Sequence, residues 1–587
     1  MNPLLSDRFV DYLLFDVLHC EQLCELPHFK EHSRAATLSP WLDACRRLGR
    51  ETLWPTYRAM DEAPARFERG EVTLHPLMKQ LWPKLAELGV ISAGRPMSVG
   101  GQQLPMTFFN FGIAYLMAGN LSAYGLAGLT TGAAHLIEAF GSPELKARYL
   151  EPMYSGRWTG TMALTEPHAG SSLADLTTSA TPSGDHHKLK GSKIFISGGG
   201  QDLTENIVHL TLARIDGAPK GTKGISLFVV PKLRPRAPGQ AGLEPNDVQV
   251  SGLIHKIGWR GLPSVALALG EEGDCHGWLV GAPGQGLKLM FQMMNEARLV
   301  IGVNGAATAS VAFHESLAYA RDRKQGRPLG VTDPAAPPVA IIEHPDVKRM
   351  LLRQKAIVEG SLGLLGIASR HADLAEHSPD EAQRARSKLL LDLLTPLAKT
   401  FPAEKGFESN TLALQIHGGY GYSSEYLPEA WLRDQKLNTL HEGTTTIQGL
   451  DLLGRKVVAQ GGAALMALNE ELEATFERAG AGELVTSMRA AAERVMSLTA
   501  TLGGRGAEGD LEGMLGHSAD YLELMSALVL GWVWLELSAK APDDDFGRGL
   551  KQAAQYWIRT EVSRVPELAA RCESAERSYL DLKPEWL

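Results

Sequence analysis

Cysteine is scarce in this sequence, with five residues among 587, at positions 20, 24, 45, 275 and 572. An odd number of widely spaced cysteines argues against a disulfide framework and for a reducing compartment. Cys20 and Cys24 lie four residues apart on a predicted helix beside His19, but a metal site would need further ligands nearby and the sequence offers none. We therefore predict buried small residues here, no metal, and a cytoplasmic protein.

An excess of basic charge is also missing, which argues against a general nucleic-acid binder. Lys and Arg number 58 and Asp and Glu number 67, so the formal net charge is −9. Residues 461–587 carry 12 basic and 21 acidic residues, whereas residues 1–460 carry 46 of each. The whole negative charge therefore belongs to the C-terminal region, and the rest of the chain is neutral.

The sequence predicts no integral membrane span. Residues 96–137 contain no charged side chain, but Gln, Asn, Pro and Gly interrupt them. The apolar run Leu524–Leu535 has only 12 residues, fewer than the ~20 that a spanning helix needs. The N-terminus has neither a basic n-region nor a small-residue cleavage site. We predict that both apolar stretches form helices buried inside the protein.

The pattern along the chain predicts a mainly α protein with a middle β-domain. The length corresponds to about three to five domains. Helical periodicity covers residues 1–155, short β-prone runs separated by turn residues cover 156–280, and helical signals return over 281–458. The stretch AQGGAAL (459–465) is typical of a linker, and residues 462–587 are predicted as an additional acidic helical domain.

The first segment with chemical potential is MALTEPHAGSSLADLTTSA (162–180), with KGSKIFISGG (190–199) after it. Taken alone, Gly, Ser and Thr at this point are typical of a chain turn. The functional interpretation is that Thr165, Gly170 and Ser171 offer hydroxyl and N–H groups to an anionic group or to the polar edge of a planar cofactor. Phe195 and Ser197 would then supply a packing ring and a donor from a neighbouring strand.

The second segment is residues 414–449, LQIHGGYGYSSEYLPEAWLRDQKLNTLHEGTTTIQG. Its glycines allow the backbone to approach another group closely. Glu442 precedes Gly443 and three threonines, and a carboxylate on such a turn can act as a general base towards a substrate carbon. The structural alternative is a helix start, which Thr caps and where Glu suits the helix dipole.

Together these segments resemble the acyl-CoA dehydrogenase family over about residues 80–455. The similar motifs are ALTEP-HAGS, KIFIS-GG, the helix from EARL to ARDRK, and QIHGGYGYSSEY leading to HEGTTTIQ. The chain looks most like the larger bacterial members. The resemblance implies an N-terminal helical domain, a β-barrel-like domain and a C-terminal four-helix bundle, followed here by the additional helical domain.

The resemblance implies FAD-dependent dehydrogenation of an acyl-CoA to the trans-2-enoyl-CoA. Glu442 would abstract the α-proton while flavin N5 accepts the β-hydride, and the electrons would pass to an electron-transferring flavoprotein. Some family members carry the base on the bundle helix, immediately before the arginine of the EARL-type motif. That position is Ala297 here, and Glu296 is one residue away, so Glu442 is the expected base.

The family pattern also assigns binding roles and implies a homodimer. Ser171, Arg298 and Gly443 correspond to substrate contacts, with Arg298 expected near the phosphates of CoA, and Arg323 is expected to reach the FAD of the neighbouring subunit. The positions that match FAD contacts are Met162, Leu164, Thr165, Gly170, Ser171, Phe195, Ser197, Arg323, Gln415, Gly419, Thr444 and Thr446.

The sequence departs from the family pattern at four places. Ser172 stands where Asp is usual, Phe195 where many members have Trp, and Ala430 where a basic residue is expected. The Phe-Gly pair after ARDRK is replaced by the loop QGRPLGVTDPAAPPVA. These departures concern flavin and subunit contacts rather than the base.

Three alternatives remain open from the sequence. An acyl-CoA oxidase would keep the fold and pass electrons to oxygen. A DNA-binding alkylation-response flavoprotein would need a basic C-terminal domain, which the charge of −9 in residues 461–587 opposes. Desulfination on the same scaffold would call for an altered carboxylate, whereas Glu442 is present.

Overall fold

The structure, a computed structural model, describes residues 2–236 and 241–587, and for residues 291–295 only the backbone. Its contacts divide the chain into two compact units. The first unit comprises Met1–Thr37 together with Arg298–Leu587, and the second comprises Leu38–Ala297. Helix α7 (Gly286–Asp322) contains the point where the chain passes from the second unit to the first. Each unit is described by itself.

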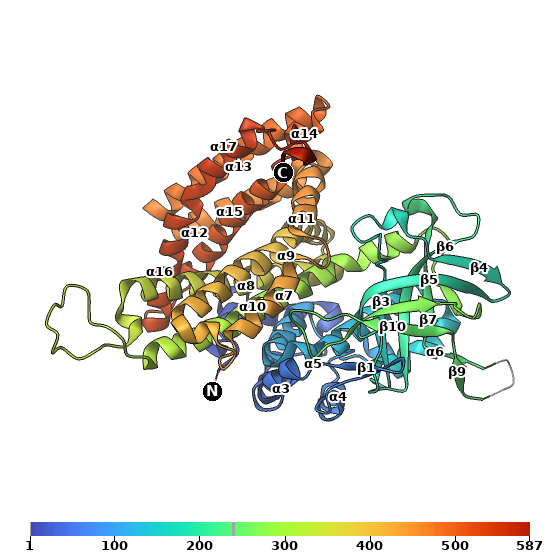
Figure 1. Cartoon of the computed structure of the whole chain (residues 1–587). Coiled ribbons are helices and arrows are strands. Elements are labelled where there is room, and N and C mark those ends of the chain that lie inside the picture. The colour runs from blue at the N-terminus through green and yellow to red at the C-terminus, as the bar shows by residue number, and fades with distance from the viewer. Residues whose placement is uncertain (1, 237–240) are drawn as a thin grey trace. The chain divides into compact units, whose positions relative to one another are not determined.

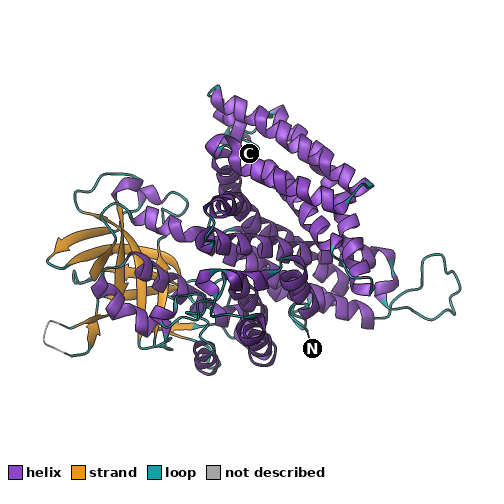
Figure 2. Cartoon of the chain, turned by 180° about the vertical axis from the view of Figure 1, so that it is seen from behind, coloured by secondary structure: helices purple, strands orange, loops and turns teal. Residues whose placement is uncertain are grey.

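The second unit combines helices with all the described strands (Figure 2). Its longest helix is α5, and the predicted buried helix over 96–137 is confirmed by it, because most of its side chains are buried. The helix is interrupted at Asn120, whose Oδ1 accepts from the N–H of Ala123 at 3.1 Å and so caps the second half of the helix. The helices of this unit before α7 are α2 (Ser39–Arg47), α3 (Tyr57–Glu62), α4 (Met78–Glu87), α5 (Met106–Phe140) and α6 (Pro143–Tyr154).

The predicted middle β-domain is an eight-stranded mixed sheet in the order β10-β11-β5-β12-β7-β6-β3, with β4 pairing β5 and β6. Its core gathers small and branched apolar side chains around Phe228. The strands of the sheet are β3 (Trp158–Ala163), β4 (Ser179–Ser183), β5 (His186–Ser197), β6 (Asn206–Ile215), β7 (Ile225–Pro231), β10 (Val248–Leu253), β11 (Ser264–Leu269) and β12 (His276–Val280). Two short hairpins complete the set, β1 (Arg66–Glu68) with β2 (Glu71–Thr73), and β8 (Leu233–Pro235) with β9 (Leu243–Pro245).

The first unit is built on a helical bundle (Figure 1). Helices α7 and α9 approach closely because α7 has glycines at the contact. A Cβ built on Gly302 would lie 2.0 Å from the carbonyl oxygen of Ala398, and one built on Gly305 would lie 2.9 Å from Pro402. Besides α7, the bundle contains α8 (Pro345–His377), α9 (Glu381–His417), α10 (Pro428–Lys436) and α11 (Thr445–Asp451).

An additional helical domain follows the bundle and belongs to the same unit. The N–H of Trp534 donates to the carbonyl of Ala356 at 3.2 Å, and Gly360 and Gly363 of α8 leave room for Trp534 and Val533. The domain therefore covers the α8 side of the bundle. Its helices are α12 (Ala463–Ala479), α13 (Glu483–Ala507), α14 (Leu511–Leu515), α15 (Ser518–Ala539), α16 (Asp545–Thr560) and α17 (Val565–Ser574).

Among the described residues, one helical stretch, Leu511–Ala539, has the length and composition of a membrane span. In the structure 78% of its apolar window is buried inside the protein, which is the burial of a core helix. This agrees with the prediction of a buried helix at Leu524–Leu535.

The N-terminal segment packs on the first unit, not on the helices that follow it in the sequence. It contains α1 (Asp7–Asp11). The hydroxyl of Tyr12 donates to the carbonyl of Leu537 at 2.6 Å, and the ammonium of Lys540 donates to the carbonyl of Val17 at 2.8 Å. Residues 1–37 thus differ in their packing from the rest of the predicted N-terminal domain, 1–155.

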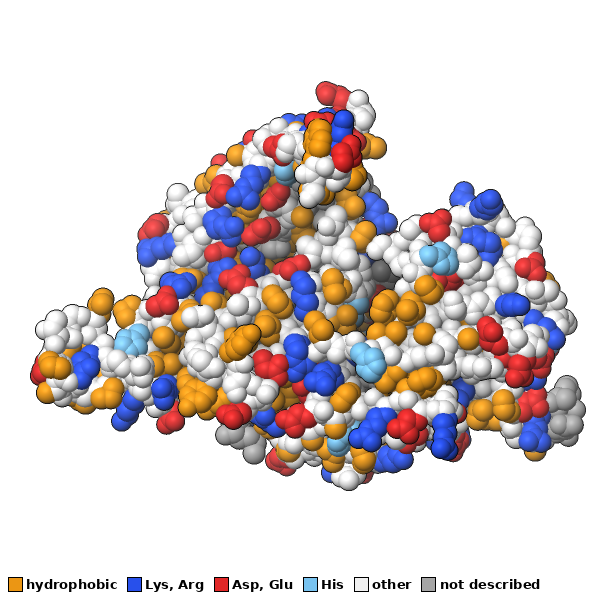
Figure 3. All heavy atoms as spheres, in the orientation of Figure 1, with side chains coloured by type: hydrophobic (Ala, Val, Ile, Leu, Met, Phe, Trp, Pro, Cys, Tyr) orange, Lys and Arg blue, Asp and Glu red, His pale blue; other side chains and the backbone are white. Residues whose placement is uncertain are grey.

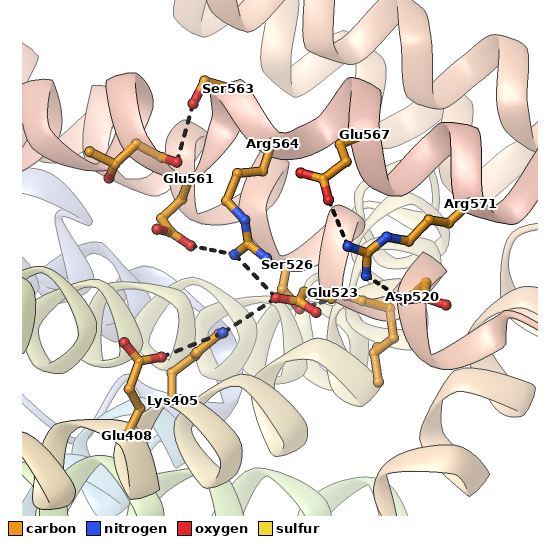
Figure 4. Close-up of polar contacts among 12 residues, drawn as sticks. Lys405, Glu408, Asp520, Glu523, Ser526, Glu561, Ser563, Arg564, Glu567 and Arg571 are labelled. Carbon is orange, nitrogen blue, oxygen red and sulfur yellow. Dashed lines mark hydrogen bonds and ion pairs between the residues drawn. The ribbon is translucent and has the colours of Figure 1, made fainter.

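Charged side chains of both signs alternate on the additional domain (Figure 3). Arg478 pairs with Glu536, Arg494 pairs with Glu573 at 2.5 Å, and Arg559 pairs with Glu483 at 2.8 Å. A second set connects the domain to α9, since Glu523 accepts from Lys405 of α9 at 3.4 Å and from Arg564 at 3.3 Å (Figure 4). The acidic residues are therefore largely distributed among ion pairs.

Candidate active site

The loop after β3 is held by a buried ion pair. The ammonium of Lys193 lies 2.8 Å from the carboxylate of Glu166 and also donates to the carbonyl of Leu164 at 3.2 Å. Both side chains are at most 1% exposed. Glu166 accepts four further hydrogen bonds, from the N–H and hydroxyl groups of Thr177 and Thr178. Thr165 lies between the two anchored residues, so its backbone position is well defined.

Burial and pairing act against each other in this ion pair. Burial alone would raise the pKa of Glu166, but Lys193 and the threonine donors outweigh it and hold that pKa below its usual range. The loop beyond Glu166 is more open, since Gly170 and Ser171 are exposed. The backbone of the anchored part is thus rigid, while the predicted contact groups of Gly170 and Ser171 are accessible to a ligand.

Phe195 is presented by a β-bulge at the end of β5. The register of β5 with β11 shifts between the pairs Leu267–Lys193 and Val265–Ile196, so β5 has one extra residue there. Phe195 has φ +61° and its ring is 61% exposed. A β-bulge can redirect a side chain, and bulges are common next to active sites. The left-handed conformation of a non-glycine residue costs of order 1–3 kcal/mol, so it persists only where the surrounding structure fixes it.

The predicted FAD residues of the second unit gather around this bulge. The N–H of Ile194 donates to the carbonyl of Thr165 at 2.9 Å, which brings the loop beside the bulge. Met162 belongs to β3, Leu164 follows that strand, and Ser197 ends β5. An exposed aromatic ring next to hydroxyl and N–H groups suits a flat, apolar ring system with polar edges. These residues therefore fit a flavin.

Glu442 lies on a left-handed turn that precedes α11. Its φ is +54°, and the next residue, Gly443, has φ +93°. The carbonyl of Glu442 accepts from the side-chain amide of Gln448 at 3.0 Å, and the carbonyl of Gly443 accepts from the ammonium of Lys399 at 2.8 Å. A Cβ on Gly443 would lie 2.7 Å from the same Gln448 amide. Gly443 is therefore favoured by its backbone conformation, and a larger residue would also displace the Gln448 amide from the turn.

The backbone N–H of Glu442 donates no hydrogen bond among the described residues. Its side chain is accessible, but the surrounding protein displaces bulk water, and this burial raises the pKa of the carboxyl group. The positive charges of Arg298 and Lys399 act in the opposite direction. The turn thus combines an available donor with a carboxylate of increased basicity, which is what proton abstraction next to a carbonyl requires.

The two predicted threonines after the turn have different surroundings. Thr444 is the N-cap residue of α11 but makes no side-chain capping hydrogen bond, so its hydroxyl does not serve the helix start. Thr446 is exposed on the first turn of α11. The backbone of this segment therefore begins a helix, as the structural alternative predicts. The hydroxyl of Thr444 does not cap that helix.

Arg298 occupies a different environment from the one that the family pattern predicts. It is 5% exposed, and its guanidinium donates to Asp451 of α11 at 2.6 Å. A buried, paired guanidinium is poorly placed to contact CoA phosphates. Its positive charge opposes the rise in the pKa of Glu442 that burial causes.

The alternative carboxylate, Glu296, belongs to the second unit and has a partner there. Its side chain lies 3.4 Å from the imidazole of His135. Burial would raise the pKa of Glu296, but His135 outweighs burial and keeps that pKa low. A carboxylate with a lowered pKa is a weaker base, which favours Glu442 over Glu296.

Arg323, Gln415 and Gly419 form an exposed group in the first unit. Tyr319 of α7 lies one turn before Arg323, which follows the end of that helix. The ring of Tyr319 stacks on that of His417, with the ring centroids 4.3 Å apart. His417 lies between Gln415 and Gly419, so this stack joins the end of α7 to the glycine-rich segment. The three predicted positions therefore belong to one accessible surface.

The sequence did not single out Lys399, Gln448, Asp451, Lys193 or Glu166. One signal was present, because Lys399 is the only charged residue in the stretch 393–403, LLTPLAKTFPA. A lone lysine among buried apolar residues must bond to something inside the protein. The hydrogen-bond partners themselves depend on tertiary contacts.

Comparison with known protein families covers almost the whole chain. Residues 40–157, 161–270 and 284–457 match the N-terminal, middle and C-terminal domains of acyl-CoA dehydrogenases, and residues 468–583 match a domain described as acetyl-CoA dehydrogenase C-terminal like. This domain order defines a flavoprotein oxidoreductase of the acyl-CoA dehydrogenase class with one additional helical domain.

Individual relatives agree with this assignment. The chain is 37% identical to 3-methylmercaptopropionyl-CoA dehydrogenase of Ruegeria pomeroyi, over 97% of this chain and 96% of that protein. It is 33% identical to a butyryl-CoA dehydrogenase of Syntrophomonas wolfei, over 78% and 77%. The structure of an acyl-CoA dehydrogenase of Bacillus anthracis complexed with FAD has the same fold, with a TM-score of 0.75, 20% identity, and coverage of 94% of this chain and 90% of that one. The chain belongs to the acyl-CoA dehydrogenase family.

Proposed function

We propose that the protein catalyses FAD-dependent α,β-dehydrogenation of an acyl-CoA thioester to the trans-2-enoyl-CoA, with Glu442 as the base. The observation that carries this proposal is the turn at Glu442 and Gly443, where an accessible carboxylate of raised pKa adjoins an N–H that donates to no group in the described part of the chain. Butyryl-CoA and 3-methylmercaptopropionyl-CoA dehydrogenases are among the relatives, so short and sulfur-containing acyl chains are the first substrates to test.

Removal of an α-proton leaves negative charge on the thioester oxygen, so the site must stabilise an enolate as the proton leaves. The N–H of Glu442 is the donor that we assign to that oxygen. Loss of one such donor typically costs about 2.7–4 kcal/mol of transition-state stabilisation. The Glu442 carboxylate receives the proton, and its raised pKa brings it closer to the pKa of an efficient base at neutral pH.

Bound FAD would supply the acceptor for the β-hydrogen, which leaves as hydride. We assign Met162, Leu164, Thr165, Gly170, Ser171, Phe195 and Ser197 to flavin contacts, with Ser171 and Gly443 also near the substrate. Thr444 and Thr446 are assigned to the dinucleotide. Arg323, Gln415 and Gly419 are assigned to the FAD of a second copy, because their surface is exposed, and this assignment implies a homodimer. Electron-transferring flavoprotein is the proposed acceptor of the electrons, and the cytoplasm is the proposed location.

The test is Glu442→Gln, which keeps the size of the side chain and removes its basicity. We expect the variant to purify with FAD, and to lose flavin bleaching by butyryl-CoA under anaerobic conditions by at least ~100-fold. In the unchanged protein, bleaching should weaken as the pH falls towards the raised pKa of Glu442, because the protonated carboxyl cannot accept a proton.

The matched control is Glu296→Gln, which removes the alternative carboxylate considered for the same role. It should bleach at close to the normal rate, and the opposite ranking of the two variants would overturn the assignment of the base. Measuring peroxide during turnover in air separates the dehydrogenase from an oxidase, and rapid peroxide release would contradict the proposed electron acceptor.

A further inference from the structure

Lys399 is a buried lysine whose bonding pattern is unusual for a helix interior. It lies in α9, in a continuous run of buried residues from Thr395 to Ala403, and is 0% exposed. Its ammonium donates to the carbonyl of Gly443 at 2.8 Å. Burying an ammonium group costs several kcal/mol. Here the buried ammonium bonds to Gly443, the residue next to the proposed base.

The turn that Lys399 supports needs outside support. Two consecutive residues, Glu442 and Gly443, have positive φ, and the left-handed conformation of a non-glycine residue costs about 1–2 kcal/mol. Both carbonyl oxygens of the turn accept from buried side chains, Gln448 for Glu442 and Lys399 for Gly443. These two bonds fix the peptide planes on either side of the Gly443 Cα atom.

Lys399 is also part of the charge balance around the base. The groups whose charges act on it are Glu404 of α9, Glu442 of the turn and Arg298 of α7. Burial lowers the pKa of His441, and the charge of Lys399 lowers it further. Burial lowers the pKa of the Lys399 ammonium to about 8, against the two carboxylates, which favour the charged form. At neutral pH the group therefore remains mainly cationic.

We propose that Lys399 is a positioning residue for proton abstraction: by holding the Gly443 carbonyl its ammonium fixes the turn that carries Glu442, and its charge favours the ionised carboxylate. Gln448 supports the turn without charge, so the electrostatic part belongs to Lys399 and Arg298. This inference rests on the proposed function, because it concerns the same base.

The experiment measures proton abstraction separately from oxidation. A 3-thiaacyl-CoA has sulfur at the β-position, so it cannot give up a β-hydride. Its α-protons can still be taken by Glu442, exchange with D₂O and return as deuterons, which NMR follows as loss of the α-proton signal. The exchange rate is recorded against pH for the holoenzyme and for Lys399→Met, Lys399→Gln and Lys399→Arg, together with FAD content and thermal unfolding. Lys388→Met, at an exposed lysine of the same helix, is the matched control.

For Lys399→Met we expect the acid limb of the exchange profile to move up by about one pH unit, which is about tenfold less exchange on that side of the profile. Lys399→Gln keeps a donor for Gly443 without the charge and should show the same shift with a smaller loss of maximal rate. Lys399→Arg should leave the acid limb in place. If the neutral variants retain FAD and fold, but keep the original acid limb and maximal rate, the proposal is wrong.

The outcomes also separate this inference from the proposed function. If Glu442→Gln still exchanges the α-protons, the base is misassigned and both proposals fall. If Glu442→Gln abolishes exchange and the Lys399 variants match the unchanged enzyme, only the role of Lys399 is contradicted. Should Lys399→Met fail to fold, Lys399→Gln and Lys399→Arg still differ in charge and give the same comparison.

Discussion

The buried ion pair between Glu166 and Lys193 anchors the loop after β3, which carries proposed flavin contacts. Lys193 binds the residues on both sides of Thr165, through the carbonyl of Leu164 and the carboxylate of Glu166. Thr165 itself accepts from Ile194 at 2.9 Å. Three successive residues of the loop therefore bond to β5. If one of these bonds is lost, the backbone that carries the proposed flavin contacts should become less well fixed.

We predict that Lys193→Met leaves Glu166 ionised and buried without its cation. Such a loss costs about 3–5 kcal/mol, so the variant should unfold at lower temperature and lose FAD on dialysis. Lys190→Met, at an exposed position of the same strand, should retain both stability and FAD. The measurements are thermal unfolding and the ratio of flavin absorbance to protein. Equal FAD retention by the two variants would contradict the role given to the pair.

At the scale of elements, the approach of α7 to α9 fixes the position of Lys399. Pro402 has no N–H to offer to the carbonyl of Ala398, and Gly302 of α7 abuts that same oxygen. This contact between the two helices is therefore one residue from Lys399 in the sequence.

Gly302→Val is expected to push the two helices apart, because its Cβ would lie 2.0 Å from a backbone oxygen. Overpacking of this kind costs about 1–3 kcal/mol, and the displaced Lys399 should also lower the rate of proton abstraction. Gly503→Ala, in α13 where a Cβ meets nothing within 4 Å, should instead stabilise the protein by up to about 1 kcal/mol. A chemical denaturation series with initial rates for each variant checks both effects.

Elements with long, regular patterns could be predicted from the sequence, and local departures from regularity could not. The apolar run before residue 137 predicted α5, but its interruption at Asn120 depends on a side chain that replaces a backbone acceptor. The motif predicted a glycine-containing turn at Glu442, whereas the bulge at Phe195 arises from the register of β5 against β11. The burial of Arg298 could not be predicted, because its partner, Asp451, is 153 residues away.

At the scale of the first unit, Arg353 joins the bundle to the additional domain. This α8 residue is 8% exposed and pairs with Glu408 of α9 at 2.7 Å and with Glu561 of the additional domain at 2.5 Å. Its guanidinium also lies 5.4 Å from the ring centroid of Trp557. Three elements far apart in the sequence therefore share one cation.

Arg353→Met should destabilise the unit by about 1.5–3 kcal/mol, because Glu408 and Glu561 lose a charged hydrogen-bond donor while each keeps a second cation nearby. We expect limited proteolysis within residues 459–465 to release the additional domain from this variant at temperatures where the unchanged protein resists cleavage. Arg559→Met removes an exposed pair with Glu483 and should cost at most about 1 kcal/mol. If both variants are cleaved alike, Arg353 does not hold the domain in place.

The position of the N-terminal segment has a consequence for biosynthesis. Tyr12 and Val17 bond to Leu537 and Lys540, so these two residues find these partners only after more than five hundred further residues have left the ribosome. Contacts of such long sequence separation form late. The apolar side chains around Tyr12 and Val17 must therefore stay partly unpacked until the last helices are made, which makes this segment a natural recognition site for chaperones and proteases during synthesis.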